Sequence, residues 1–148
     1  MPDDLYDRDF YLWTQAQAEA LRARGRGGNQ IDYDVLAEEV EDMGRAERNK
    51  AASLASRIVQ HFFYLAWSQR PEPRGGWRSE IRNFRDDLDR TLTPTIRRQI
   101  GADLKDLHLR AARAAQDAFK SHEPGVPVDI SLRWTMAQIM GEENDPID

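Results

Sequence analysis

The sequence predicts an all-α protein, an antiparallel bundle of about five helices with a short helix near the C-terminus. Apolar residues recur at spacings of three and four in every long segment, while alternation of apolar and polar residues is nearly absent. The chain is also rich in Ala, Leu, Arg, Glu and Gln and poor in β-branched runs. We expect residues 1–148 to form a single helical domain, with a core at about 5–120 and an irregular tail at 121–148.

The first two helices are delimited by residues that typically begin and end helices. The first is expected over about Asp7–Arg24, and the glycine-rich segment Gly25–Gly28 forms the loop that ends it. The second lies within Ile31–Gly44, where Asp32 offers an N-cap oxygen and Gly44 a stop.

An apolar stripe on this second helix is predicted to face the core. Its members are four and three residues apart: Leu36, Val40 and Met43. Most of the acidic residues of the segment point away from the stripe. Glu39 lies on its shoulder, so we expect the Glu39 carboxylate at the rim of the core.

The third helix begins near Gly44 or continues through it, and it extends to about Ser68. One side carries a core stripe: Ala51, Leu54, Ile58, Phe62 and Leu65. Phe63 and Trp67 lie on a different side. A helix that is apolar on two sides is either central in the fold or covers a partner, which makes Phe63 and Trp67 candidate interface residues.

The later elements are separated by proline and glycine. Two prolines and two glycines predict a non-helical connector at Gln69–Gly76, followed by a helix over about Trp77–Leu92. Thr93 caps the fifth helix, which ends before Pro124. The segment Thr135–Gln138 is typical of a capping box and predicts the last short helix.

Composition excludes several classes of function. The chain has no cysteine, which excludes disulfides, thiolate metal sites and thiol catalysis. Its formal net charge of −5 argues against non-specific nucleic-acid binding. No signal-peptide pattern opens the chain and no apolar run is long enough to span a membrane, so we expect a cytoplasmic protein without a membrane partner.

One set of residues could carry chemistry: Glu39, His61, His108 and Arg85. Both histidines lie near the apolar faces of their helices, where two imidazoles and a carboxylate would resemble a zinc or iron ligand set or an acid–base site. The usual helical ligand spacings are absent. The alternative is a structural network in which Glu39 is buried and hydrogen-bonds Arg85 or His61. No cofactor is expected.

Five short motifs, in this order and spacing, resemble a bacterial family called domain of unknown function 29. They are D-F-Y-L-W at 9–13, L-A-E-E-V-E-D-M-G at 36–44, a histidine before two apolar residues at 61–63, E-P-R-G-G-W at 72–77 and I-x-x-x-R at 81–85. The resemblance covers about residues 5–140 and implies an all-helical fold, but no activity. Tyr64 stands where the family usually has lysine, so any role of that lysine is absent here.

These observations predict a non-enzymatic helical interaction or regulatory module. We expect it to form a homodimer or to dock a protein partner through Phe63 and Trp67. The alternative function is a helical-bundle enzyme or a metal- or anion-binding protein that uses Glu39, His61, His108 and Arg85.

Overall fold

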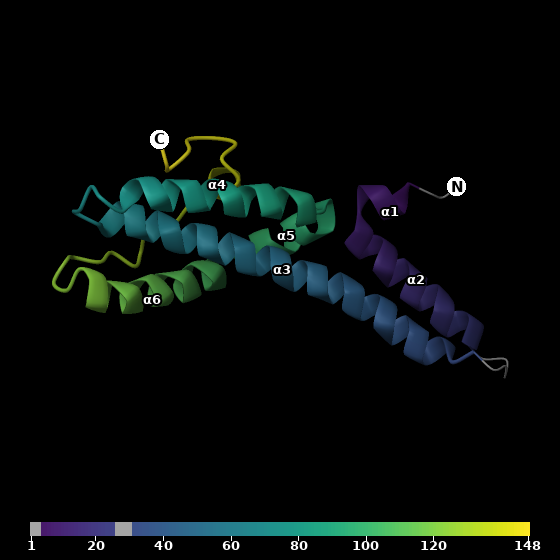
Figure 1. The fold of residues 1–148 in the computed structure, drawn as a ribbon. Helices are drawn as coiled ribbons and strands as arrows, with labels where there is room; N and C mark the ends of the chain where they lie inside the picture. Colours follow the sequence, from purple (N-terminus) through teal and green to yellow (C-terminus); the bar gives the residue numbers. More distant parts are fainter. Residues whose placement is uncertain (1–3, 26–30) are drawn as a thin grey trace. The chain divides into compact units, whose positions relative to one another are not determined.

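The computed structural model describes residues 4–25 and 31–148 and confirms an all-helical fold (Figure 1). Over these residues the chain forms no strand and seven helices: α1 (Leu5–Arg8), α2 (Phe10–Arg24), α3 (Tyr33–Trp67), α4 (Arg74–Thr91), α5 (Pro94–Ala102), α6 (Leu104–His122) and α7 (Met136–Ile139). Beyond Gly25, the predicted loop Gly25–Gly28 lies outside the described residues. Two compact units form, one from residues 1–51 and 91–99 and the other from 52–90 and 100–148.

Of the two alternatives at Gly44, the continuous helix is confirmed: Gly44 lies inside α3, so the second and third predicted helices are one. The helix boundaries differ from the prediction at three other places. The first predicted helix is divided at Asp9 into α1 and α2, and the fifth is divided at Asp103 into α5 and α6. The fourth begins at Arg74, so the last three residues of the predicted connector are helical.

Three predicted helix caps are confirmed. At the start of α3, Val35 N donates to Asp32 Oδ1 at 3.1 Å. Ile96 N donates to Thr93 Oγ1 at 3.1 Å, and Pro94 occupies the first position of α5, where its missing N–H costs nothing. Thr135 and Gln138 form the reciprocal capping box at the start of α7.

The buried face of α3 within the first unit differs from the predicted stripe. Ala37 and Ala51 are completely buried, whereas Leu36 and Met43 are 44% and 50% exposed. At about 100° per residue, this buried face is rotated by roughly a quarter turn from the Leu36–Met43 stripe. The prediction was wrong because it ranked large apolar residues above small ones.

Small residues are buried here because α2 passes close to α3 (Figure 1). A Cβ atom added to Gly44 would lie 2.2 Å from Thr14 Oγ1, which leaves no room for a side chain. Thr14 is itself fully buried on α2. Gly44 is therefore a packing residue and not a helix stop.

Asp9 joins the starts of two helices in the first unit. Its Oδ1 accepts a hydrogen bond from Leu12 N at 3.0 Å, which caps α2, and its Oδ2 accepts one from Thr95 N at 2.9 Å in the first turn of α5. Burial by itself raises the pKa of the Asp9 carboxyl group, but the hydrogen bonds outweigh it and hold the pKa below 3.8.

The second half of α3 carries the core of the second unit. Between residues 54 and 67 it buries eight apolar side chains: Leu54, Ala55, Ile58, Val59, Phe62, Phe63, Leu65 and Trp67. Helices α4 and α6 lie against it (Figure 1) and contribute the buried Ile81, Leu88, Ala111 and Ala115. Within the described residues, no helix has the length and apolar character that a membrane crossing requires.

We expect Asp9→Ala to lower the free energy of unfolding by about 2 kcal/mol at neutral pH, because α2 loses its cap and Thr95 N in the first turn of α5 loses its acceptor. Since the folded pKa lies below 3.8, this contribution is present above that pH and is lost as the pH falls through the folded value. Urea unfolding at pH 7 and pH 3 measures both effects. The exposed Asp7→Ala is the control, and equal losses for the two variants would contradict the capping role.

Candidate functional site

The surroundings of His108 give it a structural role. It is 1% exposed, its Nδ1 lies 2.8 Å from Leu104 O, and its Nε2 accepts a hydrogen bond from Trp134 N at 2.9 Å. These partners define a neutral imidazole with hydrogen on Nδ1. Burial lowers its pKa, which also favours the neutral form. His108 therefore fastens the C-terminal segment to α6.

His61 is also occupied by local partners. Its Nδ1 lies 2.7 Å from Arg57 O in the preceding turn of α3, and its Nε2 lies 2.5 Å from Glu80 Oε2 on α4. Its ring packs edge-on against Phe84 at 5.4 Å between centroids. The carboxylate that accompanies His61 is Glu80, which sequence reasoning did not select.

Arg85 pairs with Asp145, a partner that is 60 residues away and was also not selected. The guanidinium donates to both Asp145 oxygens at 2.8 and 2.9 Å, and to the carbonyls of Gln138 and Ile139 at 3.0 and 2.9 Å. These carbonyls belong to the end of α7, where helix carbonyls lack intrahelical partners. Gly141 adopts a φ of +74°, and a Cβ there would lie 2.9 Å from Arg85 Cζ.

Glu39 does not have the predicted role. It is exposed on α3, on the side opposite the buried Ala37, so the prediction of a buried Glu39 bonded to Arg85 or His61 was wrong. In the part of the chain that the structure describes, no three histidine, aspartate or glutamate side chains come together to hold a metal ion. The four candidate residues have separate environments.

Phe63 and Trp67, the predicted interface residues, are buried. Phe63 is completely buried and packs against Trp67 and Trp134, with both ring-centroid distances at 4.9 Å. Trp67 is 5% exposed, packs against Phe119, and donates from Nε1 to Asp129 O at 3.2 Å. The second apolar side of α3 is central in its unit, so it does not present a surface to a partner.

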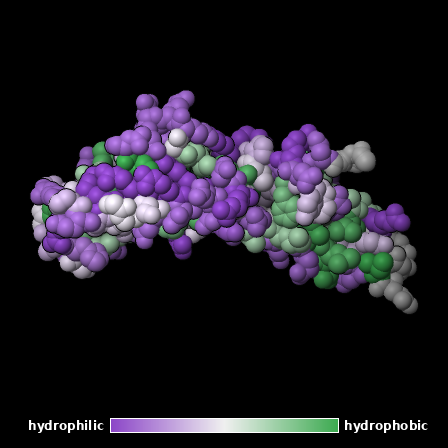
Figure 2. Space-filling model, turned by 45° about the horizontal axis from the view of Figure 1, so that its top comes forward, coloured by the Kyte–Doolittle hydropathy of each residue, from purple (hydrophilic) through white to green (hydrophobic). Residues whose placement is uncertain are grey.

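Large exposed hydrophobic residues instead gather on the first unit. Six of the seven such side chains among the described residues belong to it: Tyr6, Leu12, Ile31, Val35, Leu36 and Met43. Figure 2 shows hydrophobic residues over the region of α2 and the first half of α3. In the stripe Leu36–Val40–Met43, which we call the α3 stripe, Leu36 and Met43 are therefore exposed to solvent and Val40 is half-buried.

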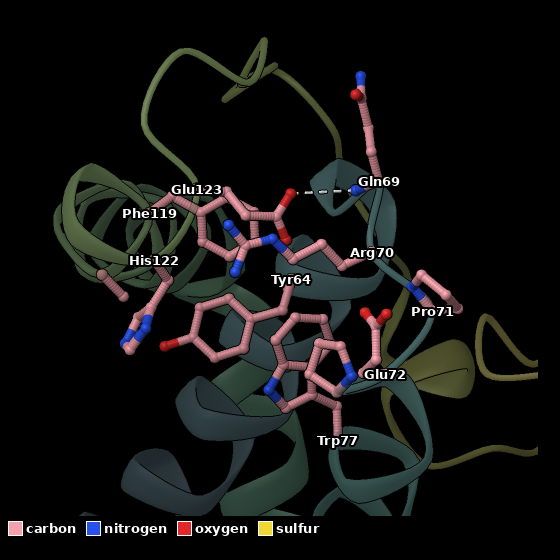
Figure 3. A pocket seen from close by; sticks show the side chains of 11 residues that line it. Tyr64, Gln69, Arg70, Pro71, Glu72, Trp77, Phe119, His122 and Glu123 are labelled. Carbon is pink, nitrogen blue, oxygen red and sulfur yellow. Dashed lines mark hydrogen bonds between the residues drawn. The ribbon is translucent and has the colours of Figure 1, made fainter.

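A pocket of about 830 Å³ lies in the second unit, between the α3–α4 connector and the end of α6 (Figure 3). Its apolar floor consists of Tyr64, Trp77 and Phe119. The Tyr64 ring stacks on Phe119 at 5.5 Å and lies 5.2 Å from Trp77. Arg70, Glu72 and His122 surround this floor.

Glu123 holds one wall of this pocket in place. Its carboxylate is buried, accepts a hydrogen bond from the Ser68 hydroxyl group, and accepts another from Gln69 N at 3.1 Å. The Ser68 hydroxyl group is the main reason that the pKa of Glu123 is lowered. The carboxylate thereby ties the connector to the end of α6.

These features define an all-helical protein with an exposed hydrophobic stripe and one aromatic-floored pocket. The model of the family described as domain of unknown function DUF29 matches residues 5–144, and the chain belongs to this family. The chain is similar to an alpha-helical protein of unknown function from Rhodospirillum rubrum ATCC 11170, whose crystal structure is known. The two are 31% identical with a TM-score of 0.80, over 95% of this chain and 92% of that chain. No protein of curated function matches the chain.

We expect Phe63→Ala to lower the free energy of unfolding by about 3–5 kcal/mol, because it leaves a cavity beneath Trp134. Ile130→Ala, at a position in the same unit that is 43% exposed, should cost less than about 1 kcal/mol. Chemical denaturation followed by circular dichroism measures both. A fully stable Phe63→Ala variant would show that this ring is not part of the core.

Proposed function

We propose that this protein is a non-enzymatic interaction module that self-associates through the α3 stripe. The observation that carries the proposal is the exposure of Leu36 and Met43, at 44% and 50%, on one face of a long helix. Large apolar side chains at helical spacing are the usual anchors of helix–helix contacts. An exposed apolar patch rimmed by charged residues is also typical of a protein interface.

The occupant that we propose is a second copy of α3 in antiparallel orientation. Residues 31–44 contain no basic residue and six acidic ones: Asp32, Asp34, Glu38, Glu39, Glu41 and Asp42. The next six residues contain three basic residues and one acidic one. An antiparallel pair places the acidic segment of each copy beside the basic segment of the other. The same contact then occurs twice, as it does in an interface with two-fold symmetry.

The point at which the two copies of α3 cross determines which charged residues face each other, and we place it between residues 44 and 45. It places Glu39 opposite Lys50 of the second copy, on the same flank of the stripe, with Met43 near the crossing point. The small exposed Ala46 next to the crossing permits close approach of the two helices. Glu39, which sequence analysis selected for chemistry, thus becomes a residue that sets the orientation of the dimer.

The main test is a pair of substitutions on the stripe. Leu36→Glu combined with Met43→Glu should raise the dimer Kd by more than about tenfold, because each interface would then enclose four carboxylates. Sedimentation velocity over a concentration series measures Kd, and circular dichroism checks the helical content. Ile130→Glu is the control, since Ile130 is 43% exposed and outside the stripe.

A charge exchange tests the orientation. Glu39→Lys should weaken the dimer by about three- to tenfold, because two equivalent pairs become repulsive. Glu39→Lys combined with Lys50→Glu should restore the wild-type Kd. A wild-type protein that stays monomeric at every concentration would refute self-association, and a double exchange that does not restore Kd would refute the antiparallel pairing.

A further inference from the structure

We propose that the pocket of the second unit binds a small planar organic anion, an aromatic ring that carries a carboxylate or phosphate group. The pocket is independent of the α3 stripe, because all its lining residues belong to the second unit. Its volume of about 830 Å³ is within the range of pockets for drug-sized ligands.

The floor determines the planar part of the ligand. Phe119 is buried beneath Tyr64, whereas Tyr64 and Trp77 are only partly buried. Because the rings of Tyr64 and Phe119 are nearly parallel, at 20°, Tyr64 is supported from one side. A ring that stacks on this floor would remove apolar surface from water without moving the core.

The hydrogen-bonding groups around the floor determine the charge of the ligand. The guanidinium group of Arg70 and the ring of His122 make no hydrogen bond within the described residues, so their N–H groups can donate to a ligand. The positive charge of Arg70 also acts on the nearby Glu123 carboxylate and helps to lower its pKa. The Tyr64 hydroxyl oxygen accepts from Gln60 Nε2, which leaves the hydroxyl proton available. Figure 3 shows this hydroxyl group directed toward His122.

The acceptors are less available than the donors. Both oxygens of Glu123 are used by Ser68 and Gln69, so this carboxylate belongs to the wall. Glu72 is the free acceptor, and it is exposed on the connector. Three free donors over an aromatic floor favour an acceptor-rich ligand, and Arg70 is the donor with geometry suited to a carboxylate or phosphate.

The pocket wall is held in position before any ligand arrives. Arg74 Nη1 donates to Leu65 O at 2.9 Å, at the end of α3, and thereby anchors the connector from its other side. Glu123 fixes the segment that carries Arg70, since it bonds Ser68 and Gln69 immediately before it. A site whose walls are fixed loses less conformational entropy on binding.

Three probes that share one ring and differ in charge test the proposal on the full chain. They are naphthalene-1-acetate, the neutral naphthalene-1-acetamide and the cationic 1-naphthylmethylamine. Chemical-shift titrations of the ¹⁵N-labelled protein should show saturable binding, strongest for the acetate, with shifts at the amides of Gln69, Trp77 and Phe119. A phosphate-bearing probe, 1-naphthyl phosphate, distinguishes the two anionic groups by its Kd relative to that of the acetate.

Two substitutions to glutamine on the same connector, each of which removes one charge, provide the comparison. Arg70→Gln should weaken binding of the acetate by about tenfold or more, because a charge-assisted hydrogen bond is lost. Glu72→Gln should leave that affinity unchanged or make it tighter. Both side chains are exposed, so both variants should fold, and their free spectra check this. The proposal is overturned if no probe saturates, if the amine binds as tightly as the acetate, or if Arg70→Gln has no effect.

Discussion

The second half of α3 is apolar around more than half of its circumference, and the second unit depends on this one property. Phe62 and Phe63 lie on different sides of the helix and are both buried, so neighbours must pack on both sides. Trp134 contacts both rings, at 5.2 and 4.9 Å between centroids, and so brings the C-terminal segment onto the helix. The residues that gave α3 the appearance of an interface are therefore the reason that the unit has a core.

Buried and half-buried polar side chains then fix the irregular segments on that core. Arg85 holds the end of α7, His108 holds the backbone at Trp134, and Glu123 holds the α3–α4 connector. Each of them bonds at least one backbone group, which would otherwise be left without a partner at a helix end or in a turn. A helical core meets its loops at its edge, and polar side chains located there bond the backbone of the loops. Residues that resemble a catalytic set in the sequence can therefore have structural roles.

Sequence reasoning predicted the elements well and their partners poorly. Hydrophobic periodicity and the caps at Thr93 and Thr135 located most of the helices, because these signals are local. The pairing of Arg85 with Asp145 spans 60 residues and follows from the path of the C-terminal segment, which no local pattern encodes.

The prediction of which face of α3 is buried in the first unit was wrong for a different reason. Burial there is decided by how closely α2 approaches Gly44, and a scale that weighs apolar side chains assigns no weight to glycine.

The close approach of α2 to α3 also explains why the first unit has an exposed hydrophobic surface. Because α2 and α3 meet through small residues such as Ala18, Ala37 and Gly44, their interface has no room for Leu36 or Met43. Exposure of such side chains to water costs about 25 cal/mol of free energy per Å² of apolar surface. A partner that covers them would recover this energy, whereas the small-residue contact beneath would remain unchanged.

The two units thus offer different kinds of surface: an amphipathic stripe suited to another helix, and a preformed aromatic pocket suited to a small molecule. Since they share no residue, a variant that loses the proposed self-association should keep the proposed anion binding, and the reverse should also hold.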